Sequence, residues 1–191
     1  MLWKTGLRWP CEIILRDLIR SDVGDCRSPN HVVSWQPANM ASKDQVNFNE
    51  PHAPAENALE AFGAVEDKIK AAIIESRHHW DKHEPRMWSR AKGVSDSDLV
   101  NFNLKDDLVL VSSGPTTYGT IILGKIRLPA IKDDLGEGFV HVRIHDPPNR
   151  GTEDIIFHSL WTDEVRPDPE APPTEYHAIQ TADKRLEFFN E

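Results

Sequence analysis

The clearest periodic pattern of apolar side chains lies in residues 53–84. Six of them recur at spacings of three, four or seven positions, which places them on one face of a helix: Leu59, Phe62, Val65, Ile69, Ile73 and Trp80. Pro54 lies where a proline in the first helical turn is tolerated, and Pro85 ends the pattern. We therefore expect one long amphipathic helix, in which Gly63 costs about 1 kcal/mol relative to alanine.

Four later segments have the short, β-branched or alternating patterns that are typical of strands. They are residues 107–113, 118–128, 139–145 and 154–161. Gly119 and Gly124 lie inside the second segment, and glycines inside a strand usually mark a bulge or a bend. We therefore expect a curved antiparallel β-meander.

An amphipathic helix needs a partner for its apolar face, and a meander needs one face covered. Both needs are met if the helix packs across the sheet. The predicted fold class is therefore α+β, with the long amphipathic helix on the curved β-meander in a cone-like or roll-like arrangement. The alternative is an SH3-like barrel with the helix appended outside.

The first 39 residues differ from the rest of the chain. Residues 1–39 contain both cysteines and three of the six tryptophans, and five basic against four acidic residues give them a net charge of +1. We expect a poorly ordered N-terminal leader, after which Met40 is a plausible chain start. A mitochondrial transit peptide is the alternative, although the four acidic residues argue against it.

Residues 40–166 are then expected to form a single α+β domain. Residues 167–173 contain four prolines between acidic residues, which is typical of a stiff linker. Beyond them, a set of residues at helical spacing predicts a short C-terminal helix: Ile179, Ala182, Leu186 and Phe189. Residues 167–191 would thus be a proline-rich linker followed by that helix.

The net charge of −9 over 191 residues limits the classes of partner. Nucleic acids and anionic membrane surfaces are disfavoured, because phosphate binding needs clustered Lys and Arg side chains. No apolar run approaches the roughly 20 residues that a membrane-spanning helix needs, and Arg8 and Glu12 interrupt any secretory signal. We therefore expect an acidic, soluble, cytoplasmic protein whose partner is a neutral or cationic small molecule or another protein.

The hairpin formed by residues 139–161 carries the candidate chemistry. Apolar and polar residues alternate along its first strand, with Val142 on the apolar face. The register of a hairpin follows from the pairing that keeps the apolar side chains together. That pairing places Val142 across from Phe157, with the histidines of both strands on the opposite face.

This register collects five candidate catalytic residues: His141, Arg143, His145, Asp154 and His158. A histidine beside Asp154 in a concave sheet could act as a general acid or base, because its unperturbed pKa lies near 6.5. Arg143 would then stabilise developing negative charge. The alternative is a solvated outer surface on which these histidines are simply polar.

Metal binding is not expected. Residues four apart on a strand lie about 13 Å from each other, so His141 and His145 cannot easily share one ion. His79 and His83 are one helical turn apart, but cationic side chains at a helix C-terminus already interact favourably with its dipole. We also find no Gly-x-Gly-x-x-Gly, Walker-type or His-Glu-x-x-His motif, so we predict neither a metal nor a cofactor.

Three functions remain open, and the sequence leaves open whether the protein is an enzyme. The first is a binding or accessory domain that uses the concave sheet or the helix end bearing Trp80 and His79. The second is a cofactor-free isomerase, cyclase or dehydratase that uses the His/Asp/Arg cluster. The third is a structural or homo-oligomerising role of the sheet face.

Overall fold

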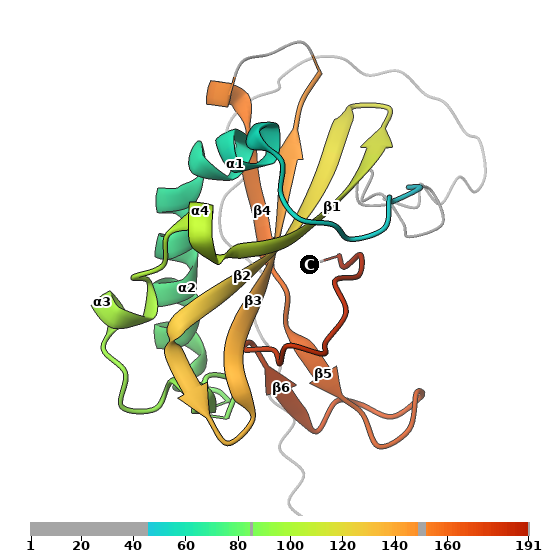
Figure 1. Cartoon of the computed structure of the whole chain (residues 1–191). Helices are drawn as coiled ribbons and strands as arrows, with labels where there is room; N and C mark the ends of the chain where they lie inside the picture. Colours follow the sequence, from blue (N-terminus) through green and yellow to red (C-terminus); the bar gives the residue numbers. More distant parts are fainter. Residues whose placement is uncertain (1–45, 85, 149–151, 191) are drawn as a thin grey trace, which may run out of the picture. The chain divides into compact units, whose positions relative to one another are not determined.

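The computed structural model describes residues 46–84, 86–148 and 152–190 (Figure 1). All of them belong to one compact unit, residues 38–191. The predicted leader, residues 1–39, and the possible chain start at Met40 lie outside the described residues. The fold combines helices with antiparallel sheet, as the sequence predicts.

The amphipathic segment forms two helices, α1 (Glu56–Gly63) and α2 (Glu66–Trp80), instead of the single long helix expected over residues 53–84. Helix α1 ends at Gly63, which has the weakest helix propensity of the residues between Glu56 and Trp80. The β-branched Val65 then leaves helical geometry, with φ −120° and ψ 11°. The apolar face nevertheless continues across the break, because Phe62, Val65, Ile69 and Ile73 are all buried.

Short helices follow in the segment between α2 and the sheet. They are the 3-10 helix η2 (Ser89–Ala91), α3 (Asp96–Leu99) and α4 (Leu104–Asp107). Side chains cap two of them: Ser95 accepts a hydrogen bond from the amide of Asp98, and Asn103 accepts one from the amide of Lys105.

The main sheet has four antiparallel strands in the order β1-β2-β3-β4. Their bounds are β1 (Leu108–Thr116), β2 (Gly119–Asp133), β3 (Gly136–Asp146) and β4 (Ile156–Leu160), with the 3-10 helix η3 (Thr152–Asp154) before β4. A second sheet pairs β5 (Asp163–Val165) with β6 (Glu175–His177). The main sheet is not closed into a barrel, so the SH3-like alternative does not describe it.

Helices α1 and α2 cover one face of the main sheet, and the C-terminal segment covers the other (Figure 1). The contact between α1 and the sheet is close at Gly124, where the ring of Phe62 occupies the space that a Cβ would need. The larger apolar cluster lies on the helical side. The smaller one lies beneath the C-terminal segment.

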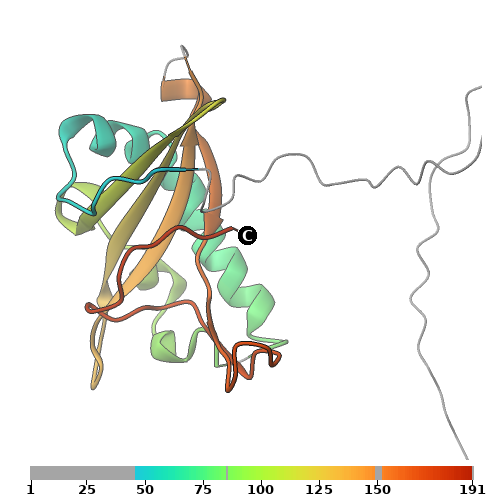
Figure 2. The same cartoon turned by 90° about the vertical axis from the view of Figure 1, so that its right-hand side faces the viewer.

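The C-terminal segment is not the short helix that the spacing of Ile179, Ala182, Leu186 and Phe189 predicts. Residues 178–190, which we call the C-terminal strap, contain no helix and cross the strands in Figure 2. Their backbone carbonyls are engaged elsewhere: Lys125 Nζ donates to Thr181, Ala182 and Lys184. A helix needs such carbonyls for its own hydrogen bonds.

The proline-rich residues 167–173 have a different place from the one predicted. They connect β5 to β6 within the two-stranded sheet, where Thr174 N donates to the carbonyl of Val165 over 2.8 Å. They therefore do not separate the domain from a terminal helix.

Candidate functional site

The predicted alignment of Val142 with Phe157 is wrong. The observed pairs are Val142 with Leu160, Arg143 with Ser159, and Ile144 with Phe157. A bulge inserts His158 as one extra residue in β4, which strict two-residue alternation does not reveal. Phe157 keeps its place on the helical face, but Leu160 joins it there instead of lying beside the histidines.

His141 lies in the centre of the sheet and is fully buried. Its ring stacks on Trp161, with ring centres 5.1 Å apart, and neither ring nitrogen has a hydrogen-bond partner. Burial, with a smaller contribution from the nearby charges of Lys125 and Lys184, lowers the pKa of His141 to about 3. The imidazole is therefore neutral at physiological pH and poorly placed for proton transfer.

Arg143 is buried beside His141 and binds the strap. Its Nη1 donates to the carbonyl of Phe189 over 2.9 Å and to Oδ1 of Asn190 over 2.7 Å. Its guanidinium also lies over the ring of Phe188. Burial lowers the pKa of Arg143. These contacts make Arg143 an anchor of the C-terminal segment.

His145 and Asp154 lie in a different place. Both line an open hollow of about 540 Å³ together with Lys68 and Tyr118. No hydrogen bond joins the two side chains within the described residues. His158 is exposed, and its Nδ1 lies 3.0 Å from Oγ of Ser159.

The pKa of His158 is lowered by partial burial and then by the charges of Arg143 and His145. The five predicted residues thus lie in three places. His141 and Arg143 are buried in the sheet, His145 and Asp154 line the hollow beside Tyr118, and His158 lies on β4.

A larger hollow lies between helix α2 and strand β4, and we call it the α2–β4 groove. Its volume is about 580 Å³. Helix α2 and the residue Met87 contribute Ala72, Glu75, Ser76, His79, Trp80 and Met87. Strand β4, the connection that follows it and the second sheet contribute Phe157, Ser159, Leu160, Thr162, Glu164 and Tyr176.

Aromatic rings form one end of this groove. Trp80, the last residue of α2, lies 5.9 Å from Tyr176 of β6 between ring centres, with the planes 30° apart. His79 meets the edge of Trp80 at 5.7 Å. All three rings are at least partly exposed, and all three line the groove.

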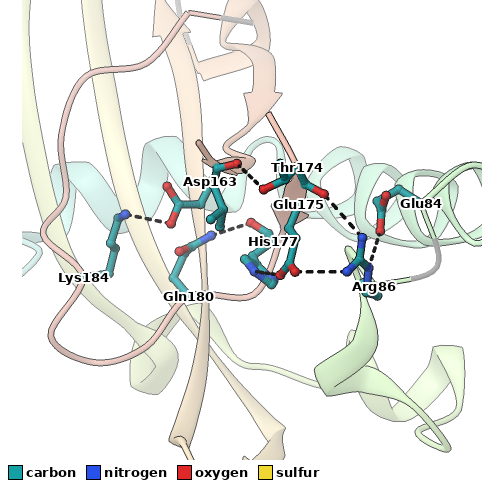
Figure 3. A network of polar contacts seen from close by, with 9 residues as sticks. Glu84, Arg86, Asp163, Thr174, Glu175, His177, Gln180 and Lys184 are labelled. Atoms are coloured by element: carbon teal, nitrogen blue, oxygen red, sulfur yellow. Dashed lines mark hydrogen bonds and ion pairs between the residues drawn. The ribbon is translucent and has the colours of Figure 1, made fainter. Parts of the chain in front are cut away.

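Ion pairs hold the two aromatic residues in place. Arg86 donates to Glu84, just after α2, over 3.1 Å and to Glu175 of β6 over 3.0 Å (Figure 3). Its Nη2 also reaches the carbonyl of Thr174. Arg86 therefore clamps the end of α2 to the strand that carries Tyr176.

The charged side chains of the groove are acidic. Glu75 and Glu164 line it, and neither Lys nor Arg does among the described residues. Glu164 also pairs with Arg166, which lies outside the lining. Within the part of the chain that the structure describes, no three His, Cys, Asp or Glu side chains are placed to hold a metal ion.

The sequence singled out the helix end with Trp80 and His79, but not the residues opposite. Tyr176 and Glu164 come from short strands that flank the proline-rich connection. Nothing local in the sequence pairs them with α2, because their position depends on the tertiary contact through Arg86.

No protein-family model matches the chain, and neither the curated proteins nor the solved structures include one with significant similarity to it. Among the residues that the structure describes, no helix has both the length and the apolar character needed to cross a bilayer.

Proposed function

We propose that the protein is a soluble cytoplasmic binding or accessory domain that takes a neutral or cationic group in the α2–β4 groove. The observation that carries this proposal is the lining of the groove, in which aromatic and apolar side chains stand beside the carboxylates of Glu75 and Glu164. A volume of about 580 Å³ is in the range of hollows that bind ligands.

The alternative of a cofactor-free isomerase, cyclase or dehydratase has less support. It rests on His145 and Asp154, which line one hollow. His141 and Arg143 are buried under the strap, where a substrate would first have to displace it. The same cover argues against the sheet face as a surface for self-association.

Three probes of similar size and different charge test the binding function: butylammonium, 1-butanol and butyrate. We expect the first two to shift the methyl signals of Met87 and Leu160 in NMR spectra of the full chain, and butyrate to shift them at least threefold less. Trp80→Leu should reduce the shifts. Tyr118→Leu is the matched control, because Tyr118 is an exposed aromatic outside the groove.

The proposal is wrong if none of the three probes shifts Met87 and Leu160, or if butyrate shifts them as strongly as butylammonium.

A further inference from the structure

Strand β4 lies at an edge of the main sheet, with β3 as its strand partner. Among the described residues, no backbone hydrogen bond links Ile156–Leu160 to any segment other than β3. The opposite edge differs, because His52 exchanges two backbone hydrogen bonds with Val111 of β1. Unpaired N–H and C=O groups on an edge strand are a template for a further strand.

The α2–β4 groove reaches this edge. Phe157 and Leu160 pack toward the helical face, whereas Ser159 pairs with Arg143 and faces the other side. Residues from both faces of β4 therefore line one hollow, so the hollow runs along the outer edge of the strand. On the facing helix, Ala72 and Ser76 are small and leave room for a backbone.

A groove between a helix and an edge strand suits an extended peptide, whose backbone pairs with the strand while alternate side chains enter pockets. Here the pocket at the end of the groove has Trp80 and Tyr176 as walls. Aromatic faces attract cations, because the ring quadrupole is negative above the ring plane. Glu75 adds a carboxylate on the helix side.

We propose that the α2–β4 groove takes an extended basic segment of a protein partner, which adds as a strand to the outer edge of β4. A Lys or Arg side chain of that segment lies against Trp80 and Tyr176, near Glu75. Charge complementarity selects this occupant, since the described lining is acidic and the chain carries a net charge of −9. This inference rests on the proposed binding function and names its ligand class.

Pools of amidated heptapeptides test it, with randomised flanks and one fixed central residue: Arg, Lys, Ala or Glu. We expect the Arg and Lys pools to shift the signals of Met87 and Leu160 at least threefold more than the Glu pool at equal concentration. The variant Glu75→Gln should reduce this preference. The matched control Glu60→Gln, on α1 and outside the groove lining, should not.

Strand addition has its own readout. Bound peptide should slow hydrogen exchange of the outward-facing amides of β4 at least tenfold, and an Arg pool with N-methylated backbones should not. Equal binding by N-methylated peptides, without protection of β4, would overturn strand addition and leave the groove as a binding site.

The remaining outcomes separate the two proposals. If the peptide pools leave the signals of Met87 and Leu160 unchanged while butylammonium shifts them, the ligand is a small molecule. This inference then fails, while the proposed binding function stands. If neither the pools nor any of the three small probes shifts the signals of Met87 and Leu160, the proposed function fails as well.

Discussion

The imidazole of His141 lies stacked on the indole of Trp161, with the two planes 13° from parallel. The stack is covered by the strap, and no part of the His141 ring reaches solvent. A histidine in such a place is held as an apolar ring, because both of its nitrogens lack partners. One of the five residues that the sequence gives as catalytic candidates is therefore a packing element in the structure.

This arrangement predicts a dependence of stability on pH. The pKa of His141 is about 3 in the folded protein and near 6.5 in an unfolded chain. Between these values the unfolded state binds a proton that the folded state does not, so His141 destabilises the fold as the pH falls below 6.5. Its contribution approaches about 1.4 kcal/mol for each pH unit.

The variant His141→Phe keeps the stack and removes the titrating group. We expect the free energy of unfolding, measured in urea at several pH values, to fall less steeply in the variant than in the wild type between pH 6 and pH 4. Above pH 7, His141 is neutral in both the folded and the unfolded state. The free energies of unfolding of the variant and the wild type should therefore run parallel there. If the free energies of unfolding of the two proteins differ by a constant amount over the whole pH range, His141 has the same pKa in the folded and the unfolded state, and the prediction is wrong.

The strap makes a second prediction about stability. Lys125 is 2% exposed and donates to three strap carbonyls. The variant Lys125→Met leaves those carbonyls without their donor, and we expect it to destabilise the protein by roughly 2 to 4 kcal/mol. Hydrogen exchange should accelerate most in residues 178–190.

Lys132→Met on the same strand is the matched control, because Lys132 is exposed. It should change stability by less than about 0.5 kcal/mol. If Lys125→Met behaves like this control, the strap is not anchored through Lys125.

The helical side of the fold follows closely from the sequence, and the strap side does not. The periodicity of Phe62, Val65 and Ile69 predicted a buried stripe because helical packing repeats locally. The break after Gly63 is not predicted by that periodicity, because the apolar spacing continues unchanged across it.

The site illustrates the same limit. The predicted pairing of β3 with β4 is off by two residues at Phe157, which pairs with Ile144, and the bulge at His158 adds a third residue before Leu160, which pairs with Val142. Apolar alternation does not detect the two-residue shift, since either register leaves Val142 and Phe157 on one face. The sequence predicted one side of the groove, because it placed Trp80 at the end of a helix as a candidate binding surface. Its other half, with Tyr176, is brought there by contacts between segments far apart in the chain.

A third prediction concerns the contact between α1 and the sheet. At Gly124 an added Cβ would meet the Phe62 ring. We expect Gly124→Ala to lower the free energy of unfolding by about 1 to 3 kcal/mol. The comparison is Gly63→Ala, because a Cβ at Gly63 meets nothing within 4 Å, and alanine at this helical position should stabilise by up to about 1 kcal/mol.

A double-mutant cycle with Phe62→Leu completes this test. The smaller side chain should relieve part of the cost of Gly124→Ala, which gives a coupling energy above about 0.5 kcal/mol. If the changes in the free energy of unfolding are additive, the alanine side chain at position 124 does not clash with the Phe62 ring, and the prediction is wrong.

The last prediction concerns Arg86, a positioning residue of the groove that does not line it. Removing exposed ion pairs costs little, so Arg86→Met should lower the free energy of unfolding by less than about 1 kcal/mol. The variant should still weaken the nuclear Overhauser contacts between the Trp80 and Tyr176 rings and reduce the butylammonium shift of Met87 by at least twofold. Arg185→Met removes a comparable exposed pair with Glu50 and should leave both readouts unchanged. Equal loss in the two variants would mean that general surface charge, and not the clamp between α2 and β6, determines binding in the groove.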